Sequence, residues 1–116
     1  MVRVFAVVAL VVLLPPAALA QGPAMPGVER GRAIANTVCW ACHVVGPDQE
    51  FSPILREPGP DFRAIAKKPD VSLQSLTAFL QSTHGLQGKP YRMPNPRLTD
   101  DMITEVARYI MSLRNP

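Results

Sequence analysis

The chain has 116 residues, 47% of them hydrophobic and 18% charged, and its 12 basic and 9 acidic side chains give a formal net charge of +3. This length fits one small domain, and a nucleic-acid-binding surface is excluded because the basic residues form no stripe interleaved with aromatic ones. A closed zinc site needs four ligands, so it is excluded too: the chain holds two cysteines and two histidines, and His84 lies far from the others.

Residues 1–20 have the pattern of a secretory signal peptide. Arg3 precedes an apolar run over residues 4–14, a proline pair ends that run, and residues 18–20 read Ala-Leu-Ala, so cleavage is predicted before Gln21. The alternative is an uncleaved membrane anchor. Such an anchor needs about 20 apolar residues, and the run over residues 4–14 is shorter. We expect an exported protein with no membrane span after cleavage.

Residues 21–26 are predicted to be a flexible lead-in to a single domain over residues 27–116, whose first helix begins near Gly27. Apolar and small residues recur at helical spacing from Val28 to Val38, so one face of this helix can pack on a partner. Glycine costs about 1 kcal/mol relative to alanine inside a helix, and we interpret Gly31 as the point where a second helix approaches closely.

The segment Cys39-Trp40-Ala41-Cys42-His43 contains both cysteines and has the C-x-x-C-H pattern of c-type haem attachment. Two thiols one helical turn apart can each add to one haem vinyl group, and the adjacent imidazole then lies under the iron as the proximal ligand. The pattern predicts one covalently bound haem c, held by Cys39 and Cys42, with His43 on the iron.

Two other interpretations of this motif are less favoured, a disulfide and a redox dithiol. A disulfide between Cys39 and Cys42 would close too small a loop to add much stability. A thioredoxin-like redox dithiol would need a strand leading into the motif within a βαβ unit, and no such pattern is present.

Residues 44–59 lack periodicity and carry several prolines and glycines, which predicts a loop. A proximal histidine normally donates its second ring N–H to a backbone carbonyl. A rigid turn suits that role, so we expect the carbonyl of Pro60 to accept from His43, with Pro53 as the rival.

A short helix over residues 61–66 and a longer one capped by Ser72 are predicted next. Leu73, Leu76, Phe79 and Leu80 form one apolar face of the longer helix, which we interpret as core that faces either the haem or neighbouring helices. His84 follows where this helix ends and is interpreted either as a solvated loop residue or as a competing axial ligand.

Met93 lies in a proline-stiffened segment, unlike Met102 and Met111, which fall inside a helical pattern. Sulfur is a soft donor that favours ferrous iron, so we predict Met93 as the distal axial ligand.

The last helix has the clearest signals: Thr99 is its predicted N-cap, and two aspartates follow where the helix dipole is positive. Its buried stripe is predicted to include Ile103, Val106, Ile110 and Leu113. We expect this helix to cross the first one, with Tyr109 packed near Gly31.

On these residues the chain resembles a class I cytochrome c of the small bacterial periplasmic monohaem type. The resemblance covers about residues 27–114: the first helix with Gly31, the C-x-x-C-H motif, Gly59-Pro60-Asp61-Phe62, Met93-Pro94, and the closing helix. It implies an all-α fold of about four helices around one covalent haem, His and Met axial ligands, and crossing of the first and last helices. The loop between His43 and Pro60 is longer than in the shortest members.

The resulting hypothesis is a monomeric periplasmic electron carrier, not an enzyme, that shuttles one electron between protein redox partners. The alternative is the haem-carrying subunit of a larger periplasmic dehydrogenase or oxidase, which should show a sizeable exposed apolar patch. A haem enzyme or gas sensor would need a labile distal ligand. Lys67, Lys68, Lys89 and Arg92 could line the approach to the haem edge, where they would favour acidic partners. Arg63, Tyr91 or Arg92 could bond a haem propionate.

Overall fold

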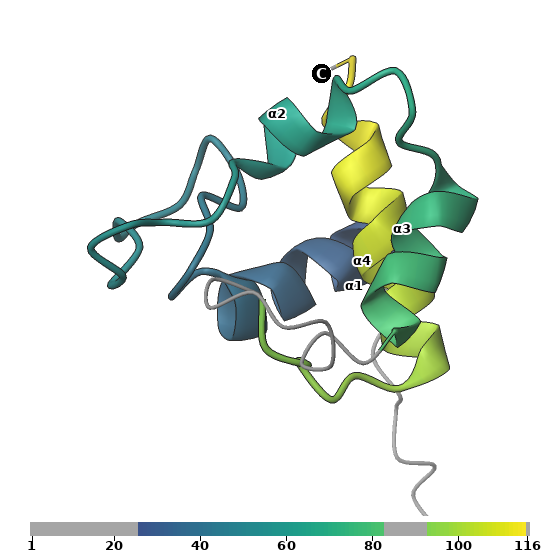
Figure 1. Ribbon diagram of the computed structural model, residues 1–116, viewed down its shortest axis with the longest axis horizontal. Coiled ribbons are helices and arrows are strands. Elements are labelled where there is room, and N and C mark those ends of the chain that lie inside the picture. The colour runs from purple at the N-terminus through teal and green to yellow at the C-terminus, as the bar shows by residue number, and fades with distance from the viewer. Residues whose placement is uncertain (1–25, 83–92, 116) are drawn as a thin grey trace, which may run out of the picture.

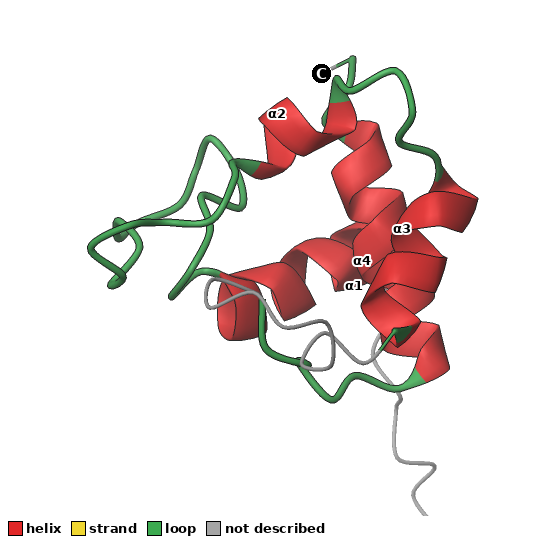
Figure 2. Cartoon of the chain, viewed as in Figure 1, coloured by secondary structure: helices red, strands yellow, loops and turns green. Residues whose placement is uncertain are grey.

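Four α-helices and one π-helical turn form the regular structure of the part of the chain that the computed structural model describes, residues 26–82 and 93–115. The helices are α1 (Gly27–Ile34), α2 (Phe62–Ala66), α3 (Leu73–Gln81) and α4 (Asp100–Ser112), and the π-helical turn η1 (Ala35–Cys39) continues α1 (Figures 1 and 2). These residues contain no strand, and none of their helices is long and apolar enough to cross a membrane. The all-α expectation is confirmed.

Side-chain caps fix where three of the helices begin. Asp61 accepts from the backbone N–H groups of Arg63 and Ala64 at the start of α2, and Thr99 accepts from Met102 at the start of α4. Ser72 forms a reciprocal capping box with Ser75 at the start of α3. The predicted caps at Ser72 and Thr99 are therefore confirmed.

Helix α1 crosses α4 at Gly31, as predicted (Figure 1). A Cβ added at Gly31 would overlap the backbone carbonyl of Glu105 and lie 2.9 Å from Cβ of Tyr109. The crossing also carries an ion pair, because Arg30 Nη1 lies 3.2 Å from Glu105 Oε1. The missing side chain at Gly31 allows the two backbones to touch.

The core lies where α1, α2 and α3 pack on α4, and η1 continues α1 into it. The buried apolar side chains are Ala35, Cys39, Val45, Phe62, Ala66, Leu76, Leu80, Ile103, Val106, Ala107, Tyr109 and Ile110. On the predicted apolar face of α3, Leu76 and Leu80 are buried and Phe79 lines a cavity, but Leu73 is 40% exposed and does not line it. Helical spacing identifies a shared face but does not show how far the neighbouring helix extends along it.

The C-terminal end of α4 is joined to the turn after α2 by one side chain. Arg114 Nε donates to the carbonyl of Ala66 at 2.6 Å, and Arg114 Nη2 donates to that of Val71 at 2.7 Å. Ala66 is the last residue of α2 and Val71 lies after that helix, so no intrahelical donor reaches either carbonyl. The guanidinium thereby fixes the turn over residues 67–71 against α4.

Several predictions fall outside the described residues. These are the signal peptide over residues 1–20, the lead-in apart from Pro26, and His84, Lys89, Tyr91 and Arg92.

We predict that Gly31→Ala lowers the free energy of unfolding by about 2–3 kcal/mol, because the new methyl group must push α1 away from α4. Denaturant unfolding of the haem-loaded protein measures the change. Gly27→Ala is the matched control, since a Cβ there meets only the flexible side chain of Arg108, at 3.4 Å. Equal stability of the two variants would contradict a tight crossing at Gly31.

Candidate haem site

The C-x-x-C-H motif continues the helical path of η1 for one further turn. The backbone N–H groups of Cys42 and His43 both donate to the carbonyl of Cys39, at 3.1 and 2.9 Å. Cys39 is buried and Cys42 is half-buried. The two thiols therefore belong to one helical turn, the arrangement that double attachment to a single planar group requires.

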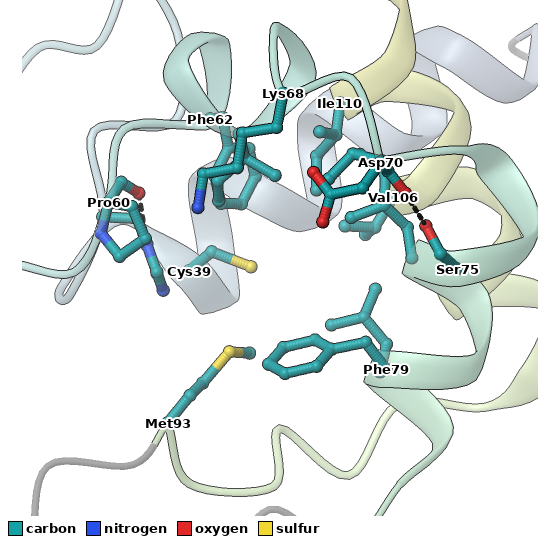
Figure 3. Close-up of a pocket in the computed structure, with 15 residues that line it drawn as sticks. Cys39, Pro60, Phe62, Lys68, Asp70, Ser75, Phe79, Met93, Val106 and Ile110 are labelled. Carbon is teal, nitrogen blue, oxygen red and sulfur yellow. Dashed lines mark hydrogen bonds between the residues drawn. The ribbon is translucent and has the colours of Figure 1, made fainter.

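A cavity of about 370 Å³ opens beside the motif, within the range of small-molecule and cofactor sites (Figure 3). Cys39, His43, Pro60 and Met93 reach it from three separate segments of the chain, whereas Cys42 is not among its lining residues. The remaining lining residues are Phe62, Ile65, Lys68, Asp70, Val71, Ser75, Leu76, Phe79, Leu80, Val106 and Ile110. This largely apolar lining, with a thiol, an imidazole and a thioether, fits a haem.

The imidazole of His43 is buried and oriented by a backbone carbonyl. His43 Nδ1 lies 2.7 Å from the carbonyl oxygen of Pro60. A carbonyl oxygen can only accept, so Nδ1 carries the proton and the lone pair is on Nε2, as a metal-ligating histidine requires. Gly59 leaves room for this ring, since a Cβ there would lie 2.5 Å from His43 Cε1.

The loop that carries Pro60 is itself bonded to the motif. The N–H of Gly59 donates to the carbonyl of Cys42 at 2.7 Å, and the N–H of Phe62 donates to that of Val44 at 2.9 Å. These two hydrogen bonds, one before and one after Pro60 in the chain, hold the Pro60 carbonyl in place. The ring of Phe62 packs on that of His43, with centroids 5.4 Å apart.

The environment of Cys39 does not suit thiol redox chemistry. Burial, and then the neighbouring Cys42, raise the pKa of the Cys39 thiol to about 11. Redox dithiols instead need a cysteine whose pKa is lowered, so that the reactive thiolate forms near neutral pH. The raised pKa therefore argues against the dithiol interpretation.

Met93 is half-buried at the opposite side of the cavity from the motif (Figure 3). Its segment has no regular structure up to Thr99, and it includes Arg97 at a φ of 53°. The side chain of Asn95 supports that backbone turn by accepting from the N–H of Arg97 at 2.8 Å.

Sequence reasoning missed part of the cavity wall. Phe79, on the helix face expected to meet either the haem or neighbouring helices, does line the cavity and directs its ring toward the Met93 thioether (Figure 3). Lys68, Asp70 and Ser75 form a polar section of the wall, where the Ser75 hydroxyl lies 3.5 Å from the backbone carbonyl of Asp70. Pro69 and Asp70 indicate a turn here, but the sequence does not show that this turn borders the cavity. Lys67 and Arg63 are exposed and do not line the cavity.

Fold and site together define a small all-helical protein with a covalently attached haem. The chain belongs to the cytochrome c family, whose model, described as "Cytochrome c", matches residues 28–114. It is 32% identical over 84 residues to a protein named cytochrome c-552 from Bradyrhizobium diazoefficiens, with 72% of each chain covered. No solved structure matches the chain. The protein is accordingly a c-type haem protein that transfers electrons.

Tyr109 links α4 to the residues just after the motif. Its buried hydroxyl donates to the carbonyl of Val45 at 2.8 Å, and its ring lies 6.5 Å from that of Phe62. Burial, and then Asp48, raise the pKa of Tyr109 above its ordinary value of 10.0. The folded protein therefore holds the phenolic proton more tightly than the unfolded chain does.

We predict that this tyrosine makes the fold sensitive to alkali. Because the pKa is raised in the folded state, the stability it contributes is fully present below the unfolded pKa of about 10 and is lost as pH rises above it. Tyr109→Phe should cost about 1 kcal/mol at pH 7 through the lost hydrogen bond, and this cost should shrink above pH 10. Unfolding measured from pH 7 to 11 in both proteins tests this, and a cost that stays constant with pH would contradict it.

Proposed function

We propose that this protein is a periplasmic electron carrier in which His43 and Met93 are the two axial ligands of a single c-type haem. The observation that carries the proposal is the meeting of Cys39, His43 and Met93 in one largely apolar cavity. Residues 1–20 are proposed to be the signal peptide that directs export, and Cys39 and Cys42 to form the two thioether bonds.

The chain's own residues would perform three tasks. The Pro60 carbonyl keeps the proton on Nδ1 of His43, so that the Nε2 lone pair is available to a metal. Met93 offers a thioether, which favours the reduced state of iron. Apolar side chains, among them Leu76 and Val106, exclude water and limit rearrangement of the surroundings. When bound, the haem supplies reversible one-electron chemistry.

Filling both axial positions with side chains leaves none for a substrate or a gas. This distinguishes an electron carrier from a haem enzyme or gas sensor, which needs an open or labile position. Among the described residues that line the cavity, Lys68 and Asp70 are the charged ones, and neither is a usual axial ligand.

We predict that the ferrous haem-loaded protein does not bind carbon monoxide readily and that Met93→Ala does, because the variant loses the distal ligand. The absorption spectrum after addition of carbon monoxide reports binding. Met102→Ala, which removes a thioether that does not line the cavity, is the control and should behave as wild type. Immediate binding by wild type would favour the enzyme or sensor hypothesis.

One observation favours the alternative function, a haem-carrying subunit of a larger periplasmic complex. Phe51, Ile54 and Leu55 are large apolar residues in the loop after the motif, and each is at least half exposed. Size-exclusion chromatography of native periplasmic extract separates the two functions. We expect the haem absorbance to elute as a monomer, and elution with a larger assembly would favour the subunit function.

A further inference from the structure

We propose that the loop after the motif is the docking face for a redox partner whose own surface presents apolar side chains ringed by lysine or arginine. We call it the loop face, and it comprises Trp40, Glu50, Phe51, Ile54 and Leu55. The inference rests on the proposed electron-carrier function and adds the kind of partner that the carrier recognises.

The loop face exposes apolar side chains that the fold does not use. Phe51, Ile54 and Leu55 are 62%, 70% and 50% exposed. Phe51 pairs with half-buried Trp40 in the motif, with ring centroids 6.4 Å apart. Contiguous exposed apolar residues mark interaction sites, and aromatic residues are enriched at interface centres.

The loop backbone that presents these side chains is ordered by its own hydrogen bonds. The side chain of Gln49 accepts from the N–H of Val45 at 2.6 Å and donates to the carbonyl of Phe51 at 2.5 Å. A prearranged surface loses less conformational entropy when a partner binds.

The loop face is attached directly to the haem-attachment motif. The backbone N–H groups of Ile54 and Leu55 both donate to the carbonyl of Ala41, at 2.9 and 3.3 Å. A partner seated on these side chains would therefore lie beside Cys39 and Cys42. This location suits electron transfer, which requires the partner to approach the haem closely.

The charge of the loop indicates a basic partner. Residues 44–57 contain three carboxylates and one arginine, whereas the whole chain has a net charge of +3. Asp48 is paired with Arg32 at 2.8 Å. Glu50 lines a hollow of about 420 Å³ together with Trp40 and Phe51. A carboxylate beside aromatic rings suits the cationic side chain of a lysine or arginine.

The first experiment locates the binding of an apolar cation that cannot take part in the redox reaction. Tris(1,10-phenanthroline)chromium(III) is aromatic, cationic and paramagnetic, so it broadens the amide resonances of residues near its binding site. We expect it to broaden the amides of residues 48–57 in the reduced haem-loaded protein, and we expect hexacyanochromate(III), a paramagnetic anion, not to do so. If the phenanthroline complex broadens other amide resonances but not those of residues 48–57, the proposal is overturned.

The second experiment links the loop face to electron transfer. One electron passes from the ferrous protein to tris(1,10-phenanthroline)cobalt(III), giving the ferric protein and cobalt(II), and stopped-flow absorbance measures the rate. Ile54→Ser and Glu50→Gln should each slow this reaction about 3- to 10-fold, because they remove apolar contact and attraction. Oxidation by the ferricyanide anion should not slow in either variant.

Matched controls lie elsewhere on the molecule. Leu73→Ser removes another exposed leucine, from α3, and Asp101→Asn removes an exposed carboxylate, from α4. Neither should slow oxidation by the cobalt complex, and slowing equal to that of the loop variants would overturn the proposal.

The outcomes separate this proposal from the function on which it rests. If neither oxidant accepts an electron from the wild-type ferrous protein, the electron-carrier function itself fails. If both oxidants react and the loop variants match wild type, the carrier function stands and the loop face is not the docking site. A dimer in sedimentation that Ile54→Ser dissociates would assign the face to a second copy and overturn the proposal.

Discussion

The close approach of α1 to α4 at Gly31 determines where the rest of the site can lie. The motif starts at the end of η1, which continues α1, so the position of Cys39 over α4 depends on that crossing. Val106 and Ile110 directly follow Glu105 and Tyr109, the α4 residues at the crossing, and both line the cavity that Cys39 enters. A larger residue at position 31 would separate the helices and change the shape of the cavity.

The loop after the motif completes this arrangement through backbone hydrogen bonds. A helical turn that ends at His43 leaves carbonyl groups without intrahelical donors. The carbonyl of Ala41 accepts from residues 54 and 55, and that of Cys42 accepts from Gly59. These bonds satisfy the end of the turn and also bring Pro60 to His43. The loop therefore contributes to the local stability of the motif and to the orientation of its histidine.

The helices could be predicted from the sequence because their signals are local: Ser72 and Thr99 are caps, and apolar residues recur at helical spacing. The Gly31 crossing could also be predicted, since a glycine inside an amphipathic helix needs a packing reason. The exposure of Leu73 could not, because spacing within α3 does not show which neighbour covers each position. The polar wall at Lys68 and Asp70 depends on a turn held by Arg114, a contact between segments distant in sequence.

In the proposed site, the residues that hold the haem differ from those that recognise a partner. Cys39 and His43 are buried and reach the cavity, whereas Phe51 and Ile54 are exposed on the loop and do not line it. Exposed side chains can change with little effect on stability, while the backbone bonds from the same loop to the motif do not depend on side-chain identity. A longer loop can therefore alter which partner is recognised without altering how the motif presents its imidazole.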